Sequence, residues 1–190
     1  MKTFYENYIA QLETAAAGMN ARVIEQLEEA LLQAILARKQ VFVLGNGGSA
    51  AAATHWACDF NKGVGLPTGV YPRMISLSDQ VATFTAIGND LSYDEVFSQQ
   101  LRALMQSGDV LLLLSVSGKS KNLLLAAEYA RTQKCQVLGI FGDYHGPAAA
   151  LCDIALTIPS QNYGVVEDLH VALDHMLSQS LMERLGEKHD

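Results

Sequence analysis

The sequence predicts an α/β fold, a three-layer α/β/α sandwich with a five-stranded parallel sheet and two additional N-terminal helices. Two observations support this class. Short apolar runs alternate with longer helix-forming segments, which is typical of parallel strands joined by crossover helices. Two of these runs also end in glycine- or serine-rich turns that lead directly into helices. The length suits one core without a domain linker, so residues 1–190 are predicted to form a single domain.

Residues 1–38 are predicted to form two helices that are separated by a break at 18–20. Their apolar side chains recur at helical spacing on two stripes: Phe4, Tyr8, Ile9 and Leu12, then Val23, Leu27, Leu31 and Ile35. A helical pair ahead of the first strand is an addition to a simple doubly wound sheet. Such a pair can pack on a second subunit, which predicts an oligomer interface, or it can cover the chain's own sheet.

The five predicted strands are short and rich in β-branched or aliphatic residues. They cover residues 41–44, 74–77, 110–114, 137–141 and 154–158. Helices are expected over residues 50–60, 80–87, 95–105, 121–131 and 165–185, with a turn at 88–90 and a long Gly- and Pro-rich connection over 61–73. The strand over 110–114 is too apolar for an edge, so we expect it inside the sheet.

The turn after the first strand reads Gly45-Asn46-Gly47-Gly48-Ser49. The helix that follows begins with unpaired N–H groups and the positive end of its dipole, so the turn favours an anionic oxygen such as phosphate. A glycine turn alone can equally be a plain connection. The turn after residues 110–114 repeats the design, because Ser115, Ser117 and Ser120 surround Gly118 ahead of the next helix. Two such turns at the carboxyl ends of parallel strands predict one phosphate site.

Histidine and carboxylate residues gather on two predicted helices. His55 and Asp59 are four residues apart on one helix face, where they can pair with each other or bind a metal ion. On the closing helix, Glu167 and His175 lie about two turns apart and roughly 80° from each other around the axis. If the two helices face each other, these four residues can converge on Zn²⁺ or a similar divalent ion. His170 is expected at the helix surface or at an interface.

Composition excludes several other classes of protein. The formal net charge of −7 argues against nucleic acid as a partner, because phosphate backbones are bound by clustered Lys and Arg. Cys58, Cys135 and Cys152 show no CxxC spacing and predict simple thiols rather than a disulfide framework. The N-terminus lacks the apolar core of a secretory signal, and no apolar run approaches membrane-spanning length. A cytoplasmic location without a membrane partner is therefore expected.

Together these motifs resemble the sugar isomerase (SIS) domain of phosphoheptose isomerases, which has a flavodoxin-like fold. The resemblance rests on Gly45-Asn46-Gly47-Gly48-Ser49-Ala50 with His55 ten positions after Gly45, on Gly88-Asn89-Asp90, on Ser115-Val116-Ser117-Gly118-Lys119-Ser120, and on Glu167-Asp168-Leu169-His170 followed by His175. It covers nearly the whole chain, and the motifs occur in the family's order.

The resemblance implies conversion of sedoheptulose 7-phosphate to D-glycero-D-manno-heptose 7-phosphate, an aldose–ketose isomerisation through an enediol that feeds heptose biosynthesis. The implied substrate-binding residues are Asn46, Gly47, Ser49, Asp90, Ser115, Ser117 and Ser120, of which the serines hold the phosphate and Asn46 and Asp90 contact the sugar. The implied metal or acid–base group is His55, Asp59, Glu167 and His175, with Asp59 as the base and His175 as its partner. Family members are typically homotetramers with active sites between subunits.

The chain departs from the family pattern at three positions. It has Asp59 where the family has glutamate, Glu167 where glutamine is usual, and Gly164 in place of an aspartate. The shorter side chain sets the Asp59 carboxylate about 1.5 Å further back, and the extra charge of Glu167 favours a divalent cation. The alternative function is a SIS protein that binds phosphosugars or associates with the replication initiator without catalysis. An isomerase for another phosphosugar is a further alternative.

Overall fold

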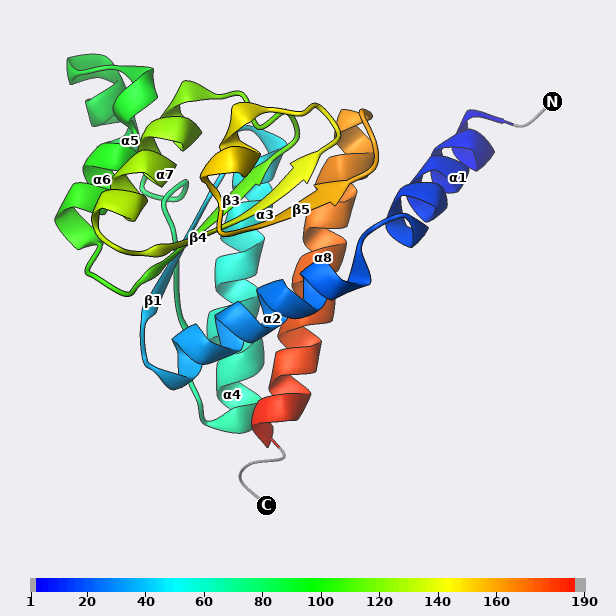
Figure 1. The fold of residues 1–190 in the computed structure, drawn as a ribbon, viewed down its shortest axis with the longest axis horizontal. Helices are drawn as coiled ribbons and strands as arrows, with labels where there is room; N and C mark the ends of the chain where they lie inside the picture. Colours follow the sequence, from blue (N-terminus) through cyan, green and yellow to red (C-terminus); the bar gives the residue numbers. More distant parts are fainter. Residues whose placement is uncertain (1–2, 187–190) are drawn as a thin grey trace.

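The structure, a computed structural model, describes residues 3–186 and contains one five-stranded sheet. The strands are β1 (Gln40–Leu44), β2 (Arg73–Ser76), β3 (Val110–Ser115), β4 (Gln136–Gly142) and β5 (Ile154–Ile158). Their order across the sheet is β2-β1-β3-β4-β5, and every neighbouring pair is parallel. Helices cover both faces of this sheet (Figure 1). The predicted three-layer α/β fold is therefore confirmed.

The helices are named here by their order along the chain. They are α1 (Phe4–Ala17), α2 (Ala21–Leu36), α3 (Gly48–Cys58), α4 (Gly65–Thr68), α5 (Val81–Asp90), α6 (Ser98–Leu104), α7 (Lys121–Thr132) and α8 (Tyr163–Gly186). A π-helix, η1 (Asp59–Val64), continues α3, and two short 3₁₀ segments are η2 (Tyr93–Glu95) and η3 (Pro147–Leu151). The predicted break between the first two helices is present, and the side chain of Asn20 caps α2 by accepting from the backbone N–H groups of Arg22 and Val23.

Successive side chains along a strand point to opposite faces of the sheet, so the hydrophobic core has two halves. In β1, Val41 and Val43 face one hydrophobic cluster, which includes residues of α2, α3 and α8. Phe42 and Leu44 face the other, which includes residues of α6 and α7. Every residue of β3 is buried, as expected for a strand in the middle of a parallel sheet with helices on both faces.

Two segments differ from the prediction. Residues 61–73 are not a plain connection, because η1 and α4 occupy 59–68. The side chain of Asn61 explains the order in this segment, since it donates to the carbonyl oxygen of Met74 at 2.7 Å and accepts from the Met74 N–H at 3.0 Å. Residues 88–90 are not a turn either, because they form the last residues of α5.

The first helix, α1, projects from the body of the molecule (Figure 1). It is tied to α8 by Tyr8, whose hydroxyl donates to Asp168 Oδ2 at 2.6 Å. Ala15 is the buried residue of α1, whereas Phe4 and Tyr5 expose 85% and 72% of their surface. The outer part of α1 therefore presents aromatic side chains to its surroundings. The interface role predicted for residues 1–38 remains a prediction.

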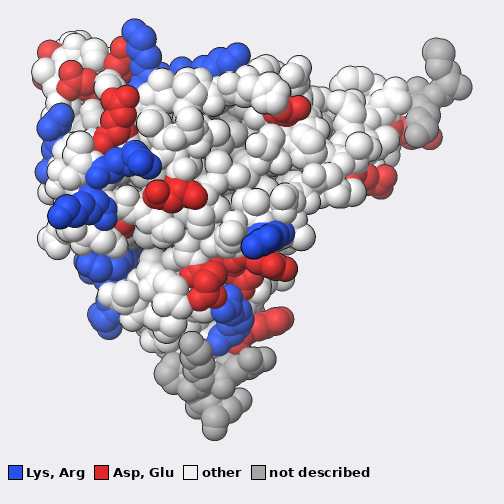
Figure 2. All heavy atoms as spheres, in the orientation of Figure 1, with Lys and Arg blue, Asp and Glu red and all other residues white. Residues whose placement is uncertain are grey.

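Charged side chains of both signs are intermingled on the face of the molecule in Figure 2, where the middle of the face and the projecting α1 carry few of them. Within residues 3–186, none of the helices combines the length and the apolar character that crossing a membrane requires.

Candidate functional site

The two glycine- and serine-rich turns lie side by side at one edge of the sheet. The first loop is residues 45–47 between β1 and α3, and the second loop is residues 116–120 between β3 and α7. They are neighbours because β1 and β3 pair in parallel, with Leu44 opposite Leu113. The carboxyl ends of both strands therefore place their loops at the same edge of the sheet, as the prediction of a shared site requires.

A pair of asparagines joins the two loops. Asn46 Nδ2 donates to Asn122 Oδ1 at 2.9 Å, and Asn122 Nδ2 donates back to Asn46 Oδ1 at 3.0 Å. The hydroxyl of Tyr93, in η2, also donates to Asn46 Oδ1 at 2.9 Å. Asn122 is buried in the first turn of α7, so this network fixes the starts of α3 and α7 relative to each other.

The second loop is shaped by its own serines. Ser115 Oγ accepts from the Gly118 N–H at 3.0 Å, and Ser117 Oγ accepts from the Lys119 N–H at 3.3 Å. Gly118 has a φ of 62°, a left-handed conformation that favours glycine. Ser120 is the N-cap of α7, but its side chain makes no cap hydrogen bond. Its hydroxyl therefore remains available to an anion at the helix start.

The remaining residues predicted to bind substrate lie in different settings. Gly47 is the exposed N-cap of α3 with a φ of 58°, and Ser49 is buried in the first turn of that helix. Asp90 ends α5 and is exposed, and its carboxylate accepts from Asn89 Nδ2 at 2.8 Å. Within residues 3–186 it makes no hydrogen bond to either loop.

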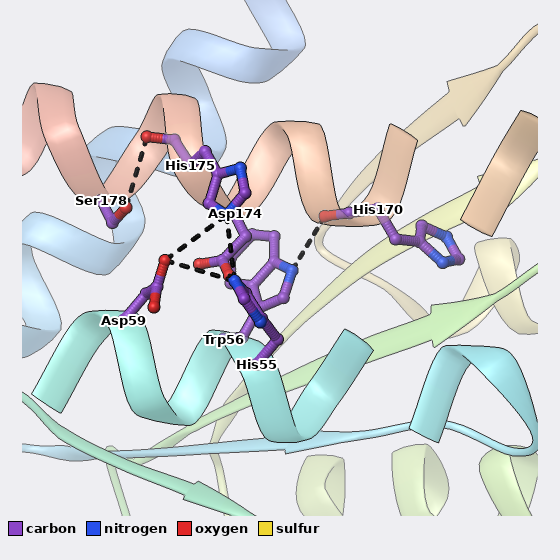
Figure 3. A network of polar contacts seen from close by, with 7 residues as sticks. All are labelled: His55, Trp56, Asp59, His170, Asp174, His175 and Ser178. Atoms are coloured by element: carbon purple, nitrogen blue, oxygen red, sulfur yellow. Dashed lines mark hydrogen bonds and ion pairs between the residues drawn. The ribbon is translucent and has the colours of Figure 1, made fainter. Parts of the chain in front are cut away.

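Four side chains from neighbouring helices form what we call the His/carboxylate cluster: His55, Asp59, Asp174 and His175 (Figure 3). Each offers one ligand atom, and these atoms all lie within 4.8 Å of one another. The Nε2 atoms of the two histidines are 2.9 Å apart, and Asp59 Oδ2 lies 3.5 Å from that of His55 and 3.6 Å from that of His175. The predicted meeting of His55, Asp59 and His175 is thus present within a single chain.

Asp174 was not predicted to belong to this cluster. Its Oδ2 lies 3.9 Å from His55 Nε2, and its side chain is completely buried, whereas those of His55 and His175 are nearly half exposed. Burial, together with the nearby charge of Asp59, raises the pKa of Asp174 to about 8.

The relative register of α3 and α8 explains why Asp174 joins the cluster and Glu167 does not. The carboxylate of Glu167 lies against Gly48, where any side chain would overlap it. His55 follows Gly48 by seven positions, and Asp174 follows Glu167 by seven positions. The two helices therefore run in the same direction, and a shift of seven residues is about 10 Å along each axis. The predicted metal role of Glu167 remains a prediction, and burial raises the pKa of its carboxyl, with a smaller contribution from Asp168.

The geometry of the cluster suits a small divalent cation. Bonds of about 2.0–2.1 Å to nitrogen and oxygen in a tetrahedral site place neighbouring ligand atoms about 3.3–3.4 Å apart. The separations between a histidine nitrogen and a carboxylate oxygen, at 3.5, 3.6 and 3.9 Å, are somewhat longer than this value, and the 2.9 Å between the two histidine nitrogens is somewhat shorter. Imidazole and carboxylate ligands suit Zn²⁺ or a similar ion, so the donor set and its spacing agree.

A hydrogen bond between Trp56 and His170 links α3 to α8 in the core. Trp56 is fully buried, and its Nε1 donates to the carbonyl oxygen of His170 at 2.9 Å. His170 is also fully buried, not at the surface or an interface as expected, and its Nε2 lies 3.3 Å from the carbonyl oxygen of Ile140. Burial lowers the pKa of His170 to about 4. This histidine is therefore a neutral core residue.

Known proteins share this fold and much of the sequence. A protein-family model described as the SIS domain matches residues 4–142. The phosphoheptose isomerase of Helicobacter hepaticus is 37% identical over 170 residues, which span 86% of this chain and 83% of that protein.

Two solved structures are similar over nearly the whole chain. The phosphoheptose isomerase from Francisella tularensis superimposes with a TM-score of 0.87 at 28% identity and covers 95% of both chains. The one from Neisseria gonorrhoeae gives a TM-score of 0.83 at 30% identity and covers 93% of this chain and 94% of its own. From the family model, the sequence identity and the shared fold, we conclude that the chain belongs to the SIS domain family.

Proposed function

We infer that this protein is a phosphoheptose isomerase that converts sedoheptulose 7-phosphate to D-glycero-D-manno-heptose 7-phosphate. The reaction is an aldose–ketose isomerisation through an enediol, formally an intramolecular oxidoreduction. The observation that carries this inference is that α3 follows the glycine-rich first loop, while α3 and its continuation η1 bear half of the His/carboxylate cluster. The relatives that share its sequence and fold are named phosphoheptose isomerases.

The phosphate of the substrate would bind at the two loops. Ser115, Ser117 and Ser120 supply hydroxyl groups around the start of α7, and Ser49 lies in the first turn of α3. Two helix N-termini at the same edge of the sheet favour a dianionic phosphate through their N–H groups and dipoles. Asn46, Gly47 and Asp90 would contact the sugar hydroxyl groups.

The isomerisation needs a base that removes a proton next to the carbonyl group and an acid that returns it to the neighbouring carbon or oxygen. Asp59 would act as the base, keep the proton as a neutral acid and return it to the neighbouring carbon, with His175 as its partner through Nε2, 3.6 Å from Asp59 Oδ2, and through the metal ion that His175 would help to hold. His55 and His175, with the neighbouring carboxylates, would hold a divalent metal ion, most simply Zn²⁺, which stabilises the enediolate oxygens when it is bound.

We further propose a homotetramer in the cytoplasm. The exposed Phe4 and Tyr5 at the projecting end of α1 offer an apolar surface to another subunit. A partner that covers this surface would bury aromatic area, which favours association. Sedimentation of the purified protein tests the subunit number, and a monomer with full turnover would contradict the assembly.

Turnover of sedoheptulose 7-phosphate, followed by NMR, tests the function directly. Wild-type protein should form the manno-heptose 7-phosphate, and Asp59→Asn and His175→Ala should each lower kcat by a factor of about 100–10,000. Ser117→Ala serves as a matched variant in the phosphate loop, where KM rather than kcat should change most. Binding of the sugar phosphate in a thermal-shift assay without turnover would instead favour a non-catalytic SIS protein. Full turnover by both cluster variants would contradict the roles of Asp59 and His175.

A further inference from the structure

Asp174 is a buried carboxylate whose one ion-pair contact within residues 3–186 is a long one, to His55 Nε2 at 3.9 Å. Its side chain has no exposed surface, and neither of its oxygens has a hydrogen-bond partner among residues 3–186. An ionised carboxylate that is buried without hydrogen bonds is strongly unfavourable, so such groups in proteins are normally closely paired or bind metal ions. The position of Asp174 therefore favours a closer, cationic partner at the cluster.

The side chains around Asp174 do not supply this partner. His55 Nε2, at 3.9 Å, already lies 2.9 Å from His175 Nε2, and Trp56 Nε1 donates to the His170 carbonyl oxygen. Asp59 adds a second negative group to the same small volume. Within the described part of the chain, no Lys or Arg forms an ion pair with Asp174. A cation between the two histidines is the partner that satisfies all these groups at once.

We propose that Asp174 is a metal ligand and that His55, His175 and Asp174 are the protein ligands of the divalent ion. Two histidines and one carboxylate form one of the known three-ligand sets of catalytic zinc sites, which keep a further position for water or substrate. The proposal deepens the proposed function, because it identifies the carboxylate that completes the metal site on α8. It also leaves Asp59 for proton transfer.

The surroundings of the two aspartates support this division of roles. Asp59 is partly exposed and lines a hollow of about 300 Å³ together with Lys62, Gly63, Ser178, Gln179 and Met182. Asp174, by contrast, has no exposed surface, and its carboxylate lies within the cluster (Figure 3). A carboxylate next to an open hollow can exchange a proton with a bound sugar. A fully buried carboxylate can interact only with the groups of the cluster and with an ion bound between them.

Measured Zn²⁺ affinity distinguishes Asp174 as the metal ligand on α8 from Glu167, the carboxylate that the sequence analysis assigned to the metal. Competition with a chromophoric chelator would measure it for wild type, Asp174→Asn, Asp174→Leu, Glu167→Gln and His55→Ala. We expect Asp174→Asn to weaken Zn²⁺ binding at least about 100-fold, because loss of an outer-shell partner alone costs 10–100-fold. Glu167→Gln removes the same charge from the same helix and should change the affinity only a few-fold.

Cobalt supplies a readout that does not depend on turnover. The visible absorption of Co²⁺ bound at the cluster reports the number and type of its ligands, so Asp174→Asn should alter the spectrum and Glu167→Gln should leave it as in wild type. Thermal unfolding of the metal-free variants shows whether each one folds. If Asp174→Leu fails to fold, Asp174→Asn, which is nearly identical in shape, carries the test.

The outcomes separate this proposal from the proposed function. Wild-type Zn²⁺ affinity and an unchanged Co²⁺ spectrum in Asp174→Asn, with weak binding in His55→Ala, would overturn the role of Asp174 alone. Loss of affinity in Glu167→Gln but not in Asp174→Asn would overturn it in favour of the sequence-based assignment. Unchanged affinity in His55→Ala as well would remove the metal from the cluster, and with it both the role of Asp174 and the metal-assisted mechanism.

Discussion

His170 should make the stability of the protein depend on pH in a way that its surroundings determine. The ring is fully buried, and burial lowers its pKa from 6.5 to about 4. Between these two pH values the unfolded chain binds a proton that the folded protein does not. The contribution of His170 to the free energy of unfolding is therefore fully present above about pH 6.5 and is lost as the pH falls to about 4. A pKa difference of this size corresponds to about 3 kcal/mol.

In the metal-free protein, Asp174 gives the opposite pH dependence of stability. Its raised pKa lets the folded state keep a proton that the unfolded chain releases above its ordinary value of 3.8. This group therefore contributes stability at low pH that is lost as the pH rises toward about 8. The two contributions offset each other over much of the acidic range, so the effect of His170 is visible only by comparison with a variant.

Urea unfolding of wild type and His170→Asn at several pH values makes this comparison. The difference in the free energy of unfolding between the two proteins should change by about 1.4 kcal/mol per pH unit between the two pKa values. Wild type should lose stability relative to the variant as the pH falls. His145→Asn, at a ring whose side chain is 88% exposed, is the control for removal of a histidine. A difference that stays constant with pH would refute the assignment of His170 as a neutral core residue.

Three further predictions concern the contact between α3 and α8 and the two loops. Trp56→Phe keeps an aromatic ring but removes the hydrogen bond to His170, so the free energy of unfolding in urea should fall by about 1 kcal/mol; no change would mean that this bond does not hold the helices. Ser120→Ala should raise KM by a factor of about 10–150, because a hydrogen bond to a charged group contributes about 1.5–3 kcal/mol, while the unfolding midpoint stays as in wild type. An unaltered KM would exclude Ser120 from the phosphate site. Gly45→Ala places a Cβ 2.7 Å from the backbone of Ser49, so we expect a loss of about 1–3 kcal/mol in stability together with a raised KM, and wild-type values for both would contradict a fixed first loop.

The layered fold could be predicted because each strand carries its own signal. Val41 and Val43 face one half of the core while Phe42 and Leu44 face the other, so a short run of apolar residues already indicates a strand covered on both sides. The order within residues 59–68 could not be predicted in this way. It depends on the bonds of Asn61 to Met74, and propensity does not report a contact with a distant strand.

The candidate site was predictable where its residues share one helix and not where two helices meet. The spacing of His55 and Asp59 indicates a common face from sequence alone. Whether Glu167 or Asp174 lies opposite them depends on how far α8 is shifted along α3, and the core packing of both helices sets that shift. Near His170, burial is a property of the assembled layers, so a polar residue on an otherwise ordinary helix gave no sign that its side chain would lie in the core.

The first loop and His55 lie at a fixed separation along α3, and this separation bears on the length of the substrate. The first loop ends at the start of α3, and His55 lies about 10 Å further along the helix axis at 1.5 Å per residue. A helix keeps this length fixed, so under the proposed function the site would select for the number of carbons between the phosphate and the carbonyl group of the substrate. A pentose phosphate whose phosphate group binds at the first and second loops would not reach the two histidines with its carbonyl group. Shorter sugar phosphates should therefore compete for the pocket without being isomerised.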